Sequence, residues 1–158
     1  MRSALVITVS DRSAAGERDD TSGPTAVRLL EEAGFAVGEP VVVSDEVDEI
    51  TRALRTAIDE GFALVVTTGG TGLGPRDVTP EATRGVIDRE VPGLTEAMRA
   101  EGRTKTPMAA LSRAIAGTAG RTLILNLPGS PTGVAESLET VLPILHHAVD
   151  VLNGPVDH

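Results

Sequence analysis

The stretch FALVVTTGGTGLGPRDVTPEAT, residues 62–83, runs from a strand through a glycine-rich loop into a helix. Phe62 to Thr68 is a continuous apolar run, as expected of a strand buried on both faces of a parallel sheet. Four glycines lie among the next six residues. Thr79 and Pro80 then predict a helix start, and we expect this helix to run to about Glu90. A buried strand that passes through a loop into a helix is the repeating unit of α/β folds.

Hydrophobic runs and turn residues extend this alternation in both directions. Upstream, they predict strands over residues 4–9 and 35–43, the latter ordered from 41 to 43, and helices over 24–33 and 46–60. Downstream, they predict a helix over 92–103, strands over 112–116 and 121–126 in a hairpin around 117–120, and a long helix from Pro131 kinked at Pro143. The pattern indicates an α/β fold: a mostly parallel sheet with helices on both faces and one antiparallel hairpin strand, in a single domain over 1–158.

Composition excludes several classes of function. A net charge of −9 disfavours non-specific electrostatic binding to nucleic acid or to an anionic membrane, so any phosphate binding has to occur at a specific site. The absence of cysteine excludes disulfides, thiolate metal sites and cysteine nucleophiles. Two phenylalanines are the only aromatic residues, which removes the stacking platforms of single-strand binders. The opening residues contain neither a signal peptide nor a spanning helix, so we expect a cytoplasmic protein.

Small, polar or acidic residues follow the predicted strands, at the sheet edge where α/β proteins bind ligands. These segments are Ser10-Asp11-Arg12, Ser44-Asp45, Thr67-Thr68-Gly69-Gly70-Thr71-Gly72 and Leu127-Pro128-Gly129-Ser130. Each segment taken alone is as typical of tight turns as of function. Four such segments on one edge favour a binding site.

The glycine-rich loop lacks the lysine of a P-loop and does not match G-x-G-x-x-G, which excludes a P-loop NTPase. Its backbone amides, unshielded by side chains, and its threonine hydroxyls suit a phosphate or a pterin, although glycine clusters also serve simple turning. Asp45 and Asp77 suit Mg²⁺, which proteins hold with one or two carboxylates together with substrate phosphates. The alternatives are that Asp45 caps the following helix, and that Asp77 pairs with Arg76 or forms an Asx turn.

Two other groups of residues favour structural roles. His146 and His147 lie in a helix without a nearby acidic or cysteine partner, so we reject a metal site there. Arg84 and Arg89 lie among acidic residues, which favours solvated surface pairs.

The segments TVSDRSAAGERDDTSGP, VVVSDEVDEI, TTGGTGLGPRDVTPEAT, VPGLTEAMR, LSRAIAG and LILNLPGSP, in this order, resemble the MogA/MoaB molybdenum-cofactor biosynthesis family, which includes the G domains of gephyrin. The resemblance covers residues 4 to 153. It implies a three-layer α/β fold, a homotrimer and binding of molybdopterin. In active members it implies transfer of AMP from Mg-ATP to the terminal phosphate of molybdopterin, with a molybdenum-insertion protein as a further partner.

The resemblance also implies roles for individual residues. Asp45 and Asp77 match the two catalytic, Mg²⁺-binding aspartates. The molybdopterin-binding positions are Thr68, Gly69, Gly70, Thr71, Gly72, Ser112, Pro128, Gly129 and Ser130. Ser10, Asp11 and Arg12 match the loop beside the nucleotide.

The leading hypothesis is therefore a molybdopterin adenylyltransferase, and the alternative is a non-catalytic molybdopterin-binding or scaffold protein of the MoaB type. An ordinary kinase or dinucleotide enzyme is disfavoured by the missing motifs. Because the ligands are polyanions and the chain is acidic, we also predict that at least two of Arg12, Arg76 and Arg113 line the pocket.

Overall fold

The computed structural model describes residues 2–154, so residues 1 and 155–158 of the predicted domain lie outside the described part. The elements are β1 (Ser3–Val9), α1 (Asp11–Ala14), α2 (Ser22–Glu32), β2 (Ala36–Val37), β3 (Val41–Val43), α3 (Val47–Asp59), β4 (Leu64–Thr68), α4 (Thr79–Arg84), β5 (Arg89–Glu90), α5 (Pro92–Arg103), the 3-10 helix η1 (Pro107–Leu111), β6 (Ala116–Ala119), β7 (Thr122–Leu127) and α6 (Pro131–Asn153).

All strands form one mixed sheet in the order β2-β1-β4-β7-β6-β5, and β3 pairs with β1 beyond the end of β2. The strands β1, β2, β3, β4 and β7 are parallel, whereas β6 is antiparallel to both β5 and β7. The predicted α/β fold with one antiparallel hairpin strand is confirmed.

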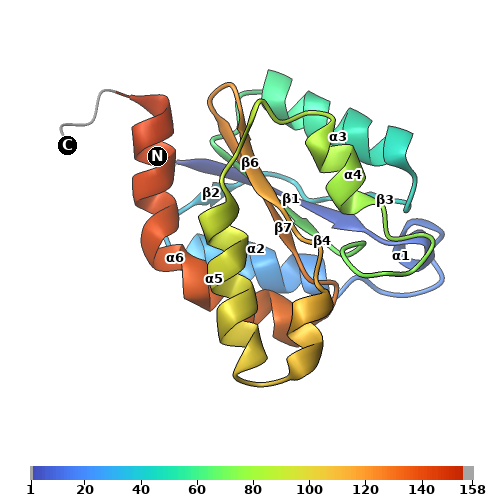
Figure 1. The fold of residues 1–158 in the computed structure, drawn as a ribbon. Coiled ribbons are helices and arrows are strands. Elements are labelled where there is room, and N and C mark those ends of the chain that lie inside the picture. The colour runs from blue at the N-terminus through green and yellow to red at the C-terminus, as the bar shows by residue number, and fades with distance from the viewer. Residues whose placement is uncertain (1, 155–158) are drawn as a thin grey trace.

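The sheet is the middle of three layers (Figure 1). Successive side chains of β1 enter opposite cores: Ala4 and Val6 pack with α2, α5 and α6, whereas Leu5 and Ile7 pack with α3 and α4. This alternation explains why the central strands are apolar without interruption, because both of their faces are covered. In the described residues, no helix is both long and apolar enough to cross a membrane.

The segment between α4 and the hairpin differs from the prediction. The helix that begins at Thr79 ends at Arg84 rather than near Glu90, because the chain turns at Gly85 and returns to pair with β6. The hairpin strand is Ala116–Ala119 rather than 112–116, so residues 117–119, assigned to the turn, belong to the strand. Gly117 is required there because a Cβ would lie 2.6 Å from the carbonyl oxygen of Arg89.

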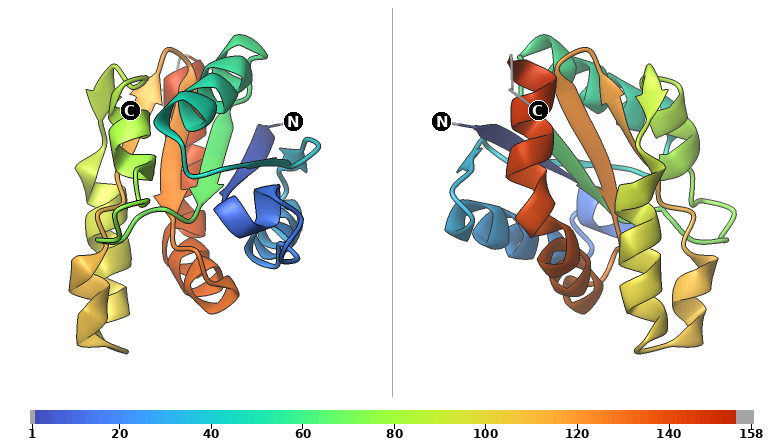
Figure 2. Two further views of the ribbon diagram at one scale, coloured as in Figure 1. Left: turned by 90° about the vertical axis from the view of Figure 1, so that its right-hand side faces the viewer. Right: turned by 60° about the vertical axis from the view of Figure 1, so that its left-hand side comes forward.

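Two short helices, α1 and η1, were not predicted from the sequence. The hydroxyl of Ser10 caps α1 by accepting a hydrogen bond from the Ser13 amide, and the hydroxyl of Thr106 caps η1 by accepting one from the Met108 amide. Their four and five residues are too short to show a helical hydrophobic period. Figure 2 shows α5 and η1 projecting together from the rest of the fold, and the site described next lies partly against this projection.

Candidate functional site

Two cavities lie at the carboxyl ends of the central strands, and the glycine-rich loop contributes to both. The acidic cavity, of about 750 Å³, is lined by Ser10, Ser13, Arg18, Asp19, Asp20, Ser22, Asp45, Thr68, Gly69, Gly70, Asp77, Gly129 and Ser130, among others. The apolar cavity, of about 350 Å³, is lined by Thr71, Gly72, Met98, Arg99, Met108, Leu111, Ser112 and Pro128, among others. Apart from Asp11 and Arg12, which lie in neither lining, the predicted site residues thus fall into two neighbouring groups.

The glycine-rich loop approaches its neighbours too closely for side chains. Gly69 and Gly70 have φ angles of 93° and 71°, which side-chain-bearing residues rarely adopt. A Cβ on Gly69 would lie 2.4 Å from the carbonyl oxygen of Val9. The amide and hydroxyl of Thr79 donate to the carbonyl oxygens of Gly70 and Gly69, which closes the loop at its base. The loop therefore lies directly on the strand ends, with its backbone open to the cavities.

Asp45 lies beyond β3 and forms a reciprocal pair of hydrogen bonds with Asp11. The amide of Asp11 donates to Asp45 Oδ2 over 2.9 Å, and the amide of Asp45 donates to Asp11 Oδ1 over 2.9 Å. Burial raises the pKa of Asp45; the Asp11 amide opposes this, and the negative charges of Asp11 and Asp77 add to it. The alternative role of helix cap does not apply, since α3 is preceded by Glu46 and its first turn has no side-chain cap.

Asp77 is held by the loop itself. Its Oδ2 accepts a hydrogen bond of 2.9 Å from the Gly74 amide, and its own amide donates to the Gly74 carbonyl oxygen. Asp77 therefore does form a local turn interaction, which was one of its alternative roles. The ion pair with Arg76 is absent, because that guanidinium binds Asp11 and Glu46 instead. Asp77 lines the acidic cavity together with Asp45, so its local bond leaves the carboxylate at the cavity wall.

The donor set fits a magnesium ion that is bound jointly with a substrate. Among residues 2–154 there is no cluster of three or more histidine, cysteine, aspartate or glutamate residues suited to hold a metal alone. Asp45 and Asp77 supply two carboxylates in one cavity, and burial with neighbouring negative charge raises the pKa of Asp45. A bound cation would offset that charge. Magnesium commonly takes one or two carboxylates and completes its shell with phosphate and water.

The prediction that at least two of Arg12, Arg76 and Arg113 line the pocket is wrong for both cavities. Arg76 is bound to Asp11 and Glu46, and its hydrogen bonds lower the pKa of Asp11. Arg113 is bound to Glu81 and to loop carbonyl oxygens. Local ion pairing therefore outweighed any attraction to an open polyanion site. Arg12 lies in α1, outside both linings.

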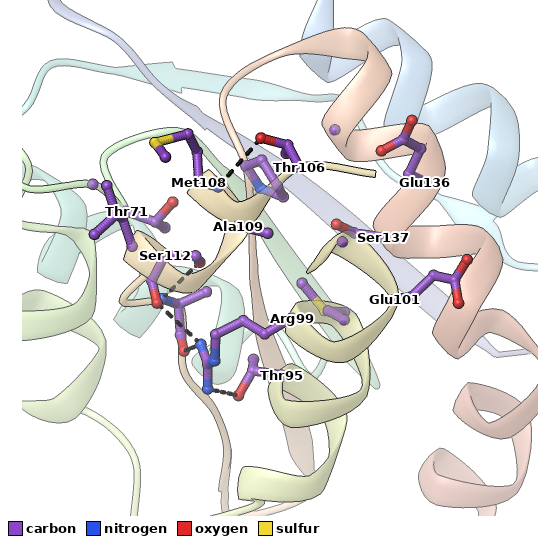
Figure 3. A pocket seen from close by; sticks show the side chains of 17 residues that line it. Thr71, Thr95, Arg99, Glu101, Thr106, Met108, Ala109, Ser112, Glu136 and Ser137 are labelled. Atoms are coloured by element: carbon purple, nitrogen blue, oxygen red, sulfur yellow. Dashed lines mark hydrogen bonds between the residues drawn. The ribbon is translucent and has the colours of Figure 1, made fainter. Parts of the chain in front are cut away.

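Two other arginines line the cavities, Arg18 in the acidic one and Arg99 in the apolar one. Arg99 extends from α5 and donates to the carbonyl oxygens of Ser112 and Ala114 and to the hydroxyl of Thr95 (Figure 3). Neither arginine follows a predicted strand, so the search along strand ends could not find them.

The apolar cavity has an apolar wall and a polar edge (Figure 3). Met98, Met108 and Leu111 come from α5 and η1. On the other side, Thr71 belongs to the glycine-rich loop and Ser112 lies beside it. Glu101 and Glu136 add carboxylates at the opposite side. An apolar group with polar substituents matches this lining. No sequence signal predicted η1, so its contribution to the cavity wall could not be predicted either.

Two of the residues assigned structural roles from the sequence, His146 and Arg84, make structural contacts. His146 stacks on Phe35 with ring centroids 4.3 Å apart, and its Nε2 contacts the carbonyl oxygen of Ala33. Arg84 forms an exposed ion pair with Glu90, as predicted.

Comparison with known proteins assigns the chain to a family. The model of a family described as "Probable molybdopterin binding domain" matches residues 5–147. The chain belongs to this family. It is 41% identical over 152 residues to the molybdopterin adenylyltransferase of Helicobacter pylori strain J99, covering 94% of this chain and 86% of that protein. It is also 45% identical over 154 residues to the molybdenum cofactor synthesis protein cinnamon of Drosophila melanogaster, covering 96% of this chain.

Solved structures of the molybdopterin-binding family share the fold closely. The molybdopterin biosynthesis enzyme MoaB from Thermus thermophilus is 54% identical, with a TM-score of 0.93 and 98% of each chain covered. Some relatives are much longer than this chain, which spans 26% of the length of the Drosophila protein and 48% of a bifunctional cofactor-biosynthesis protein of Synechococcus elongatus. The family resemblance read from the motifs is confirmed, and so is the three-layer fold.

Proposed function

We propose that this protein is a molybdopterin adenylyltransferase that transfers AMP from Mg-ATP to the terminal phosphate of molybdopterin. The observation that carries the proposal is the pairing of two cavities across one glycine-rich loop, with Asp45 and Asp77 on the acidic side. The names of the relatives support the same activity. A scaffold that only binds pterin has no use for a second cavity whose wall carries these two carboxylates.

The reaction needs alignment and charge neutralisation rather than a protein nucleophile. An oxygen of the terminal molybdopterin phosphate attacks the α-phosphorus of ATP. The bond from that phosphorus to the bridging oxygen breaks, and pyrophosphate leaves with the bond's electron pair. Bound Mg²⁺ supplies neutralisation of the phosphate charge, and Asp45 and Asp77 are the residues that would hold it.

The two cavities give each substrate a suitable surface. We assign the pterin to the apolar cavity, where Met98, Met108 and Ser112 lie, and the triphosphate together with the molybdopterin phosphate to the acidic cavity. The predicted molybdopterin-binding positions that line the acidic cavity would then contact this phosphate; they are Thr68, Gly69, Gly70, Gly129 and Ser130. The Gly69 amide donates to the Leu127 carbonyl oxygen, so the Gly70 amide is the one that would face the phosphates, where an unshielded amide binds anions well. The homotrimer and the molybdenum-insertion partner stay predictions from the resemblance, and the cytoplasmic location stays a prediction from the opening residues.

The test is a transfer assay with purified protein, molybdopterin, ATP and Mg²⁺. Adenylylated molybdopterin and pyrophosphate should form in equal amounts in the wild type. Asp77→Asn should reduce transfer to a small residual rate while leaving molybdopterin binding nearly intact, because the apolar cavity assigned to the pterin lies on the other side of the glycine-rich loop. Binding of pterin by the wild type without any ATP-dependent product would instead support the scaffold protein.

A further inference from the structure

The outer part of the glycine-rich loop has little apolar packing to hold it. Residues 73–76 are all exposed, and Leu73 at the tip has 67% of its surface exposed. Loops of this kind open easily unless polar contacts fix them. Asp77, to which we assign a role in holding Mg²⁺, lies at the far end of this segment. Its position therefore depends on whatever fixes the loop from Gly72 to Asp77.

Arg113 supplies several contacts that tie this loop to the rest of the protein. Its Nε donates to the carbonyl oxygen of Gly72 over 2.7 Å, and its Nη2 donates to the carbonyl oxygen of Asp77 over 2.7 Å. Its backbone amide donates to the carbonyl oxygen of Thr71 over 2.8 Å. One side chain thus joins the two ends of the exposed segment, and we call this arrangement the Arg113 bridge.

Arg113 is itself fixed at both its side chain and its backbone. Glu81, in the first turn of α4, accepts from Nη1 over 2.7 Å and from Nη2 over 3.2 Å. On the other side, Arg99 donates to the carbonyl oxygens of Ser112 and Ala114, the two neighbours of Arg113. The Arg113 backbone therefore has a fixed origin, and its side chain a fixed direction.

A planar guanidinium is suited to this task in a way that lysine is not. The donors at Nε and Nη2 lie in one rigid plane, so they set the separation of the two carbonyl oxygens that they bind. An ammonium group is a point charge on a flexible stem and can satisfy one of these oxygens without fixing the other. A loop held by lysine would keep its charge balance and lose its defined width.

We propose that Arg113 is a positioning residue that fixes the loop from Gly72 to Asp77 so that the Asp77 carboxylate faces the acidic cavity. The proposal rests on the function proposed above, and it assigns Arg113 no contact with either substrate. It accounts for an arginine that lies next to a site for polyanions and yet points to loop carbonyl oxygens and to Glu81 instead of into a cavity.

The test compares Arg113→Lys and Glu81→Gln with Arg84→Ala, a matched variant that removes another arginine of the α4 region from an exposed ion pair away from the loop. In the transfer assay, Arg113→Lys should lower kcat by about 10- to 100-fold, the range typical of residues that orient metal ligands. Its KM for molybdopterin should change little, and it should need more Mg²⁺ for half-maximal rate. Glu81→Gln should show a smaller loss of kcat, and Arg84→Ala should match the wild type.

A double-mutant cycle asks whether Arg113 acts through Asp77. In an Asp77→Asn background, Arg113→Lys should change the residual rate by no more than about two-fold, because its target has been removed. Full additivity of the two losses would overturn the proposal, as would a wild-type kcat in Arg113→Lys.

Hydrogen–deuterium exchange separates this proposal from the proposed function, because it needs no activity. The amides of Gly74 and Asp77, which donate hydrogen bonds within the loop, should exchange about ten-fold faster in Arg113→Lys than in the wild type or in Arg84→Ala, at unchanged global stability. Unchanged exchange in this loop would overturn the Arg113 bridge even in an active enzyme. If the wild type showed no transfer activity but exchange was faster in Arg113→Lys, the proposed function would be wrong and the Arg113 bridge would still be supported.

Discussion

The Asp45 carboxylate is held by the backbone amide of Asp11 rather than by a cation. The neighbouring Arg76 gives its hydrogen bonds to Asp11 and Glu46. As a result, the pKa of Asp11 is lowered whereas the pKa of Asp45 is raised by burial. The two aspartates bond each other symmetrically through their backbone amides, but only Asp11 bonds a cationic side chain. Asp45 is therefore the aspartate that a bound cation would stabilise more.

Asp45→Asn should therefore stabilise the free protein while abolishing transfer. The amide oxygen of asparagine can still accept from Asp11, and the repulsion from neighbouring carboxylates disappears. We expect a gain on the order of 0.5 kcal/mol near neutral pH, the size of interactions between partly exposed charges. A raised folded-state pKa means that the charge destabilises the folded state only above the unfolded pKa. The gain should therefore vanish in strong acid, and urea titrations at two pH values would measure it; a loss of stability at neutral pH would contradict this account.

Two glycines with positive φ provide a matched test of how closely the loop packs on the sheet. Gly69→Ala places a Cβ 2.4 Å from the Val9 carbonyl oxygen, whereas Gly120, with a φ of 60°, has nothing within 4 Å. Gly120→Ala should cost about 1 kcal/mol for the left-handed backbone alone. Gly69→Ala should cost at least about 3 kcal/mol, because a backbone clash adds to the strain. Urea unfolding followed by far-ultraviolet circular dichroism measures both, and equal losses would show that the loop can move away from the sheet.

At the scale of elements, Asn126 joins β7 to its neighbours through a buried polar network. Its Nδ2 donates to the hydroxyls of Thr67 on β4 and Thr83 on α4, and its Oδ1 accepts from the amide of Ile115. All of these groups are buried. The network fixes the positions of the loops that follow β4 and β7, and both loops line the acidic cavity.

Asn126→Ala should destabilise the protein by about 1–3 kcal/mol, because the Ile115 amide would be left buried without an acceptor. Thr83→Val leaves one proton of the asparagine amide without an acceptor, whereas Asn126→Ala removes all three hydrogen bonds of the network, so Thr83→Val should cost clearly less. Thermal unfolding of the two variants gives the comparison. If Thr83→Val cost as much as Asn126→Ala, packing around α4 rather than the Ile115 amide would be the cause.

Elements with a long apolar period could be predicted from the sequence, and elements set by tertiary contact could not. The thirteen residues of α3 carry a clear apolar stripe, and the helix was expected at this place. By contrast, α4 stops after six residues because the chain turns back to pair as β5 with β6. The register of the hairpin depends on Gly117 admitting the backbone of Arg89, a contact between segments that local pattern does not contain.

At the scale of the whole molecule, the rule that ligands gather at strand ends located the two cavities but not the division between them. Asp45 and Asp77, expected to meet there, line one cavity. The wall formed by α5 and η1 escaped prediction, because these elements reach the site through their packing and not through a strand end. The arginines were misplaced for a related reason: sequence position shows proximity to a site, but the nearest carboxylates decide where a guanidinium points.

Acid stability depends in part on an ion pair that joins the residue before β1 to α6. Arg2 binds Asp150, with Nε 2.7 Å from Oδ1, and these hydrogen bonds lower the pKa of Asp150 below its usual value of 3.8. A lowered folded-state pKa gives stability that is present above the unfolded pKa and is lost as the pH falls through the folded pKa. The melting temperature should therefore drop below about pH 4, and Arg2→Gln should lower it at neutral pH while flattening that drop. Arg28→Gln, which breaks the exposed pair with Glu32, serves as the matched control. An acid drop as steep in Arg2→Gln as in Arg28→Gln would show that other carboxylates carry the acid response.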